Sequence, residues 1–218
     1  MKIFLLPGLG YDERIFENLD FGDYTVEALT WIEPEPAESL LSYASRMGKR
    51  ILEEEEELIL IGHSLGGILA QTLATLKKIP KLILIASIKS REELPWHFKM
   101  VAPLRLQYFF TKGICIHTVK YWGKVHDLVT PAEQALFKSM VSRHTNTYLQ
   151  WALKTLSNWE APKLPETTTI CQIHGTKDKT FPIQYIKKPS YSIKQGSHIL
   201  LYKRSEEVSA IIRAELEK

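Results

Sequence analysis

Residues 57–78 read ELILIGHSLGGILAQTLATLKK, and this stretch decides the fold. Leu58–Ile61 is a short, continuous apolar run, which is typical of a strand that is buried on both faces. Ile68–Leu76 is apolar almost all round and predicts a buried helix. The glycine-rich residues 62–67 lie between the two, so the sequence predicts that Ser64 occupies a tight strand-to-helix turn.

The glycines around Ser64 have a steric explanation. Gly62 and Gly66 lie two positions on either side of the serine, where so sharp a turn leaves no room for side chains. Such a turn exposes the serine hydroxyl above the edge of the sheet, and the first N–H groups of the helix point to the same place. The alternative is a structural turn with an idle serine, but the flanking buried strand and buried helix favour a nucleophile.

The composition of the 218-residue chain fits one domain with an insertion. The chain is 44% hydrophobic and 24% charged, and its net charge of +3, with scattered basic residues, predicts no nucleic-acid partner. No apolar run approaches the ~20 residues of a membrane span, so we expect no stable membrane insertion. The opening apolar run is too short for a secretory signal, and Cys115 and Cys171 do not make a disulfide framework. These features predict a cytoplasmic location.

Hydrophobic patterning predicts strands alternating with helices on both sides of this central stretch. Further strands are expected at Lys2–Leu6, Tyr24–Leu29, Lys81–Ala86, Thr168–Ile173 and Ser190–Ile193. Further helices are expected at Glu13–Leu19, Glu38–Leu52 and Ser205–Leu216, the last with Ser205 and two glutamates at its start. This alternation implies an α/β fold with a mostly parallel sheet and helices on both faces.

The alternation stops between Ser87 and about Pro165. Thr130-Pro131-Ala132-Glu133 is a capping box that predicts a helix to about Arg143, and a second helix is expected at Thr147–Leu156. The segment also carries four of the five tryptophans. We expect residues 88–165, called the cap segment below, to be a helical insertion that folds over the site. Its apolar residues form a core for the insertion, line a substrate pocket, or do both.

Four candidate functional residues follow predicted strands, namely Leu9, Ser64, Asp178 and His198. Because ligands bind at the C-terminal ends of parallel strands, these residues are expected to meet at one edge of the sheet. A serine hydroxyl needs a base within hydrogen-bond reach, and the base needs an orienting acid. His198 is the favoured base and Asp178 the favoured acid, and the chain order Ser64, Asp178, His198 suits a nucleophile elbow.

The assignment of the base has rivals. The alternative bases are His63, His174 and the cap histidines His97, His117, His126 and His144, of which His63 and His174 are expected to be structural. Cys171-x-x-His174 is a weak zinc signal without a second ligand pair, so neither a metal nor a cofactor is expected.

Three motifs give the chain a resemblance to the α/β-hydrolase superfamily. GHSLGG at 62–67 is similar to the nucleophile elbow, HGTKDKTFP at 174–182 to the acid-bearing loop, and GSHILL at 196–201 to the histidine loop. The resemblance implies a single α/β-hydrolase domain over residues 1–218, with the cap segment as the family's variable cap. It also implies about six strands, ordered 2-1-3-4-5-6 in this chain's own count, with Lys2–Leu6 as the family's third strand.

The same resemblance implies an oxyanion hole formed by the backbone N–H groups of Leu9 and Leu65. The family usually has His-Gly before the first of these donors, whereas this chain has Pro7-Gly8. That departure concerns the shape of the loop, because the catalytic group is a backbone amide.

The resemblance also leaves an alternative position for the acid. Some members of the superfamily carry it after the preceding strand, which here is Lys81–Ala86, and this implies Glu92 and Glu93 as alternative acids.

The predicted activity is that of an esterase-like or thioesterase-like serine hydrolase, which transfers an acyl group to water. The aromatic cap segment favours a small to medium hydrophobic substrate, and its two-to-one excess of basic over acidic residues permits an acyl carrier or coenzyme A as a partner. The alternative is a non-catalytic binder of a small molecule or a protein on the same fold. A third class, a lipase acting at lipid surfaces, would need a basic amphipathic helix, and the sequence shows no clean one. The sequence does not predict an oligomeric state.

Overall fold

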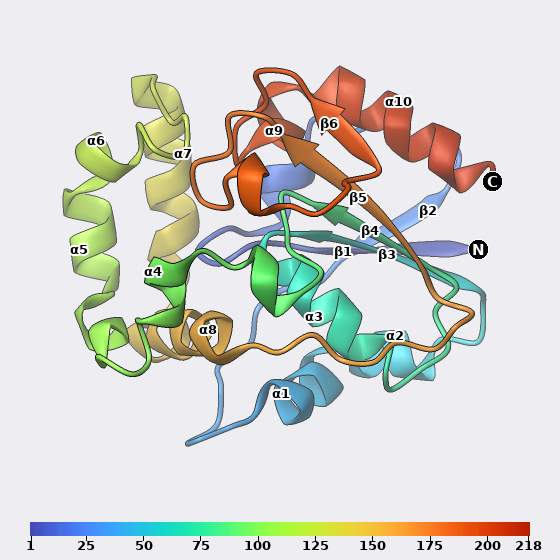
Figure 1. Ribbon diagram of the computed structural model, residues 1–218, viewed down its shortest axis with the longest axis horizontal. Helices are drawn as coiled ribbons and strands as arrows, with labels where there is room; N and C mark the ends of the chain where they lie inside the picture. Colours follow the sequence, from blue (N-terminus) through green and yellow to red (C-terminus); the bar gives the residue numbers. More distant parts are fainter.

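Six parallel strands form the centre of the protein, described here by a computed structural model of residues 1–218 (Figure 1). Their order across the sheet is β2-β1-β3-β4-β5-β6, and every neighbouring pair is parallel, so the predicted fold class and strand order are confirmed. The strands are β1 (Lys2–Leu6), β2 (Thr25–Ala28), β3 (Leu58–His63), β4 (Lys81–Ile85), β5 (Thr169–Gly175) and β6 (Tyr191–Ile193).

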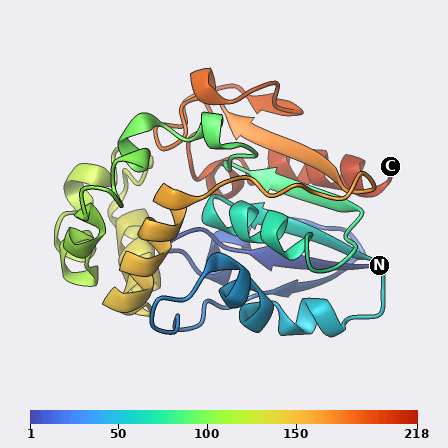
Figure 2. The ribbon, with the colours of Figure 1, turned by 60° about the horizontal axis from the view of Figure 1, so that its bottom comes forward.

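Helices cover both faces of the sheet. Figure 2 shows α3 (Leu65–Leu73) in front of the strands and α10 (Ser205–Leu216) behind them. The remaining elements outside the cap segment are η1 (Glu13–Phe16), α1 (Leu40–Met47), α2 (Lys49–Glu53), η4 (Ile183–Tyr185) and α9 (Leu200–Lys203). Helix α3 is buried along its whole length, because it packs on β1, β3 and β4 and is covered in turn by α1.

Residues between β4 and β5 form no strand, and most of their helices lie on the side of the molecule away from both termini (Figure 1). Their elements are η2 (Arg91–Glu93), α4 (Trp96–Lys99), η3 (Leu106–Phe109), α5 (Lys112–His117), α6 (Val119–Trp122), α7 (Pro131–Ser142) and α8 (Asn146–Asn158). The capping box before α7 is present, since Thr130 and Glu133 each accept a hydrogen bond from the other's backbone N–H.

The single helix predicted at Glu38–Leu52 is wrong, because the chain forms two helices that meet at Gly48. A Cβ at Gly48 would lie 2.3 Å from Cδ2 of Leu73 and 2.7 Å from the carbonyl oxygen of Ala44. Close packing against α3 therefore selects glycine here, and the helix is interrupted at this residue. The hydrophobic periodicity could not reveal the break, since α1 and α2 both present an apolar side to the core.

Other predicted boundaries need smaller corrections. Helix α3 begins directly after Ser64 and ends three residues before the predicted end, and the helix expected at Glu13–Leu19 is a short 3₁₀ helix. Helix α9 was not predicted, and it ends just before α10 begins. Arg204 therefore occupies the N-cap position of α10, and Ser205 is the first helical residue rather than the cap. No helix combines the length and the apolar character that crossing a membrane requires.

Candidate active site

Ser64 lies between the end of β3 and the start of α3 with a φ of 51°, which is unusual for a residue with a side chain. A Cβ on Gly66 would lie 2.0 Å from the carbonyl oxygen of Leu6, and one on Gly62 would lie 2.4 Å from the amide nitrogen of Gly67. The two glycines therefore allow the turn to approach β1 and its own helix closely. The carbonyl of Ser64 also accepts a hydrogen bond of 2.6 Å from the Ser87 hydroxyl, which holds the strained residue in place.

A chain of two hydrogen bonds connects Ser64, His198 and Asp178. The distance from Nε2 of His198 to Oγ of Ser64 is 3.0 Å, and the distance from Nδ1 of His198 to Oδ2 of Asp178 is 2.8 Å. An ionised carboxylate can only accept, so Nδ1 carries the proton and Nε2 is left to accept from the serine hydroxyl. All three side chains are buried, with His198 only 2% exposed.

The surroundings of Asp178 favour its charged form. Burial alone raises the pKa of Asp178, but the charge and hydrogen bond of His198, together with the Phe181 N–H, bring it below the usual value. Its second oxygen, Oδ1, accepts hydrogen bonds from the backbone N–H groups of Thr180 and Phe181 at 2.8 and 2.9 Å. The carboxylate is thus fixed by its own loop, leaving Oδ2 for the histidine.

Two backbone N–H groups beside the serine have no partner within the protein. One belongs to Leu65, the first residue of α3, and the other to Leu9, in the loop after β1. The first N–H groups of a helix have no intrahelical acceptor, and Ser64 makes no side-chain cap that would use the Leu65 donor. Both groups are therefore available to an oxygen atom of a bound ligand.

The loop after β1 is held by its Gly8 carbonyl. This oxygen accepts hydrogen bonds from Nε1 of Trp31 at 3.2 Å and from the backbone N–H of Tyr11 at 3.1 Å. In a planar trans peptide the carbonyl and the next N–H point in opposite directions, so these bonds also fix where the Leu9 N–H points. A Cβ on Gly8 would lie 3.1 Å from Cβ of Ser64, so glycine is needed for this close approach. Trp31 lies outside every predicted strand and helix, and no local pattern in the sequence marks this role.

His63 does not contact the serine hydroxyl. Its Nε2–H donates to the carbonyl oxygen of His198 at 3.0 Å, and its ring packs edge-on against Tyr11. Burial, followed by the charge of His198, lowers the pKa of His63 to about 3, so the ring is neutral. This histidine joins the turn at Ser64 to the loop that carries His198.

The rival residues make other contacts. Both carboxylate oxygens of the buried Glu93 already accept hydrogen bonds. The donors are the backbone N–H groups of Lys89 and Lys187 and the side-chain amide of Gln172. Glu92 is exposed, and among the histidines only His198 makes a hydrogen bond with Ser64.

Cys171 and His174 are three residues apart on β5, so they point to opposite faces of the sheet. No group of three or more histidine, cysteine or acidic side chains is arranged to hold a metal ion.

A cavity of about 330 Å³ adjoins the loop after β1 and reaches into the cap segment. The residues from the loop are Leu9, Gly10 and Tyr11, and those from beyond β4 are Phe110, Ile114, Cys115, Thr118, Trp122, His126, Phe137, Val141 and Leu149. The lining is mostly apolar, and its main polar feature is a 3.4 Å contact between the Tyr11 hydroxyl and Nδ1 of His126. The ring of His126 also lies edge-on to that of His198, at 5.4 Å between centroids.

A second, larger cavity of about 690 Å³ lies elsewhere, between the 34–41 stretch and α8. Ser64, Asp178 and His198 do not line either cavity. The smaller cavity is lined by Leu9 and by His126, whose ring packs against that of His198, so we associate the candidate site with the smaller cavity.

The family model described as "Alpha/beta hydrolase family" matches residues 3–211. No curated protein matches the sequence. Among solved structures, an esterase from Exiguobacterium antarcticum is similar with a TM-score of 0.75 at 14% identity, covering 100% of this chain and 92% of that one. An epoxide hydrolase from Bacillus megaterium is similar with a TM-score of 0.74 at 15% identity, covering 100% of this chain and 94% of that one. A bromoperoxidase from Bacillus anthracis is similar with a TM-score of 0.70 at 18% identity, covering 100% of this chain and 92% of that one. At such identities the likeness to these structures concerns the fold.

Proposed function

This chain belongs to the α/β-hydrolase family, and from that premise we propose that it is a serine hydrolase of carboxylic esters or thioesters. The observation that carries the proposal is the hydrogen-bonded line from Asp178 through His198 to Ser64. The partnerless N–H groups of Leu9 and Leu65 beside the serine support it. A structural serine would need neither arrangement.

In the proposed reaction, Oγ of Ser64 attacks the substrate carbonyl while Nε2 of His198 removes its proton. Asp178 stabilises the imidazolium that forms, and its lowered pKa keeps it ionised for this role. His198 then gives the proton to the departing alcohol or thiol, which leaves an acyl group on the serine. Water, activated by the same histidine, attacks the acyl-enzyme and releases the acid.

The tetrahedral intermediates carry a negative charge on the former carbonyl oxygen. We propose that the N–H groups of Leu9 and Leu65 donate hydrogen bonds to this oxygen, because neither donates a hydrogen bond within the protein. Removing one such donor typically costs roughly 10²–10³ in kcat.

The cavity beside Leu9 suggests the substrate class. Its volume of about 330 Å³ lies at the small end of ligand pockets, and its lining is mostly apolar. We infer that it takes a short to medium hydrocarbon group of an ester or thioester. The aromatic side chains of Trp122 and Phe137 would contact that group.

Hydrolysis of p-nitrophenyl esters from acetate to dodecanoate tests the proposal, with the Ser64→Ala protein measured beside the parent. Turnover that disappears in the variant, with a rate maximum at a short or medium chain, is the expected result. Stoichiometric labelling of the parent by a serine-directed phosphonate provides a second readout that does not depend on the choice of ester. A parent protein that neither turns over esters nor accepts the label would instead be a binder on this fold.

A further inference from the structure

Exposed apolar side chains are concentrated in one part of the chain. Ten of the thirteen large hydrophobic residues that are exposed lie between residues 96 and 129, which is less than a sixth of the sequence. They are Trp96, Met100, Leu104, Leu106, Tyr108, Phe109, Ile114, Tyr121, Val125 and Val129, and we call them the outer cap surface. Soluble proteins seldom gather so many such residues without a function for them.

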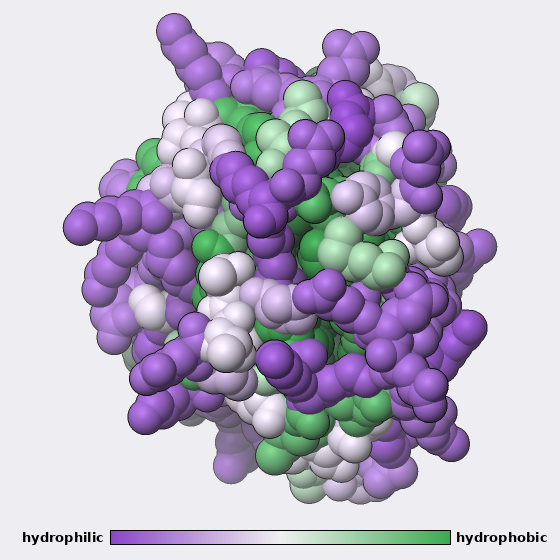
Figure 3. All heavy atoms as spheres, turned by 90° about the vertical axis from the view of Figure 1, so that its right-hand side faces the viewer, coloured by the Kyte–Doolittle hydropathy of each residue, from purple (hydrophilic) through white to green (hydrophobic).

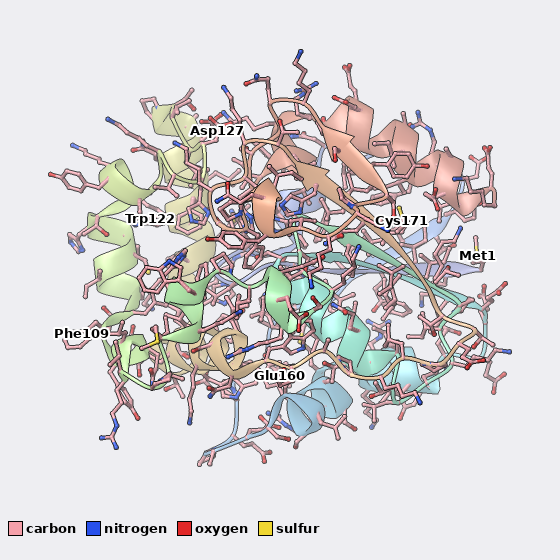
Figure 4. All side chains as sticks on the ribbon, in the orientation of Figure 1. Met1, Phe109, Trp122, Asp127, Glu160 and Cys171 are labelled. Atoms are coloured by element: carbon pink, nitrogen blue, oxygen red, sulfur yellow. The ribbon has the colours of Figure 1, made fainter.

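The most exposed members are aromatic. Trp96, Phe109 and Tyr121 are 69%, 70% and 79% exposed. Figure 4 shows Phe109 at the outer edge of the molecule, on the side away from both termini. Figure 3 views the opposite end, where hydrophilic side chains cover most of the surface. The apolar character is thus a property of one end of the protein.

The same segment carries unneutralised positive charge. Residues 96–129 contain one acidic residue, Asp127, and five basic residues, which are Lys99, Arg105, Lys112, Lys120 and Lys124. None of the five takes part in an ion pair, whereas 13 of the other 23 lysine and arginine residues do. A surface of this charge is complementary to an anionic partner.

We propose that the outer cap surface binds peripherally to an anionic lipid membrane. Single aromatic side chains that project from short helices can enter the headgroup region one by one, where Trp and Tyr are favoured. Lysine and arginine side chains beside them attract acidic lipids, and each strengthens binding by about five-fold. A protein partner would also need matching hydrogen-bond groups, whereas the exposed side chains here are dominated by hydrocarbon and positive charge.

The cavity at the candidate site connects to this surface. Ile114 is 48% exposed on the outer cap surface and also lines the 330 Å³ cavity, together with Phe110 and Thr118. A protein bound to a membrane through this surface would therefore have the cavity next to the bilayer. An apolar substrate could pass from the lipid into the cavity with little exposure to water.

No single amphipathic helix marks this surface, which explains why the sequence did not predict it. Helices α4, α5 and α6 have only four to six residues each, so no helical period extends over the segment. The surface is assembled from the ends and turns of several elements.

Vesicle flotation tests the proposal with vesicles of pure phosphatidylcholine and of equal parts phosphatidylcholine and phosphatidylglycerol. The protein is expected to float with the mixed vesicles, to bind pure phosphatidylcholine at least about ten-fold more weakly, and to lose affinity as salt increases. The Lys120→Glu, Lys124→Glu double variant should bind at least about 25-fold more weakly. The Phe109→Ser, Tyr121→Ser double variant should weaken binding about ten-fold or more.

Matched controls come from the opposite end of the molecule. Leu76 and Lys78 are both exposed and lie between α3 and β4, so Leu76→Ser and Lys78→Glu change similar side chains outside the cap segment. These variants should bind vesicles as the parent does. The Ser64→Ala protein should also bind normally, which separates this test from the outcome of the catalytic proposal.

Several results would overturn the proposal. One is a parent protein that stays unbound with the mixed vesicles, and another is equal binding by the parent and both double variants. Association with an acidic acyl carrier protein but not with vesicles would assign the surface to a protein partner. A dimer in sedimentation equilibrium that dissociates in the Phe109→Ser, Tyr121→Ser protein would assign it to a second copy of the chain.

Discussion

The indole Nε1–H of Trp31 donates a hydrogen bond to the carbonyl oxygen of Gly8 at 3.2 Å, and this bond fixes the direction of the Leu9 N–H. The family pattern has histidine where this chain has Pro7, so the loop lacks the side chain that usually shapes it. Trp31, which lies beyond β2, is one of the two donors that bind the Gly8 carbonyl of this loop.

Replacing Trp31 with phenylalanine should lower kcat about ten-fold and leave KM for p-nitrophenyl esters almost unchanged. One neutral hydrogen bond contributes about 1–1.5 kcal/mol, and the Gly8 carbonyl keeps its second donor from Tyr11. Trp159→Phe is the matched control, because Trp159 is also buried and its Nε1 has no hydrogen-bond partner. Steady-state kinetics of the two variants provide the comparison. A fall in kcat of the same size in both would mean that the Trp31 hydrogen bond has no special part in catalysis.

Ser64→Gly should raise the free energy of unfolding by about 1 kcal/mol while abolishing ester hydrolysis. The φ of 51° at this position strains any residue with a Cβ, by about 1–3 kcal/mol, and the greater freedom of glycine in the unfolded chain offsets part of the gain. Ser64→Ala should abolish hydrolysis without the gain, since alanine keeps the Cβ. Urea unfolding of the three proteins distinguishes these outcomes. Equal stability of the glycine and alanine variants would show that the turn is unstrained.

Gly66→Ala should destabilise the protein by more than about 4 kcal/mol or prevent folding. Its new Cβ would lie 2.0 Å from the Leu6 carbonyl oxygen, and neither β1 nor α3 can move without disturbing the core. Gly113→Ala is the matched control, because nothing lies within 4 Å of its Cβ position in α5. That variant should gain about 0.5–1 kcal/mol from helix propensity. Denaturant unfolding, or the yield of folded protein for Gly66→Ala, tests the pair.

The free energy of unfolding should fall as the pH is lowered from about 6.5 to about 5. Burial lowers the pKa of His63, to about 3, and also lowers those of His144 and His174. Between about pH 3 and 6.5 these histidines are therefore protonated to a greater extent in the unfolded chain than in the folded protein. Acidification in this range lowers the free energy of unfolding.

The histidine His63 gives a specific form of this prediction. In the His63→Gln protein the slope of unfolding free energy against pH should be smaller by up to about 1.4 kcal/mol per unit between about pH 5 and 6. Above about pH 7.5 the parent and variant curves should run parallel, which provides the internal control. Parallel curves at every pH would mean that His63 is protonated equally in both states.

The sequence patterns allowed the parallel sheet and the turn at Ser64 to be predicted, because each depends on residues within about twenty positions of one another. The strand order was implied by the resemblance to the α/β-hydrolase superfamily. The grouping of Ser64, Asp178 and His198 followed from the rule that parallel strands end at one edge. The break at Gly48 was missed, and the residue that leaves no room for a side chain at this position, Leu73, belongs to another helix. The function of Trp31 was missed for the same kind of reason, since its partner Gly8 lies more than twenty residues earlier in the chain.

The cap segment was the least predictable part. Its helices α7 and α8 were found from the capping box and from helical spacing. The shorter helices α4, α5 and α6 offer only one or two turns each, so no period could be detected. The exposure of Phe109 or Tyr121 depends on how these pieces pack together, which residue patterns do not contain.

The position of the cap segment between two paired strands has a consequence for synthesis on the ribosome. Strands β1 to β4 are complete once Ile85 has emerged, but β5 begins only at Thr169, roughly eighty residues later. At about 5–20 residues per second, the growing chain spends roughly 4–16 seconds with β4 as a temporary edge. In the finished protein the edges are the short strands β2 and β6, which offer little backbone to a neighbour. The nascent chain is therefore most exposed to aggregation at its future centre.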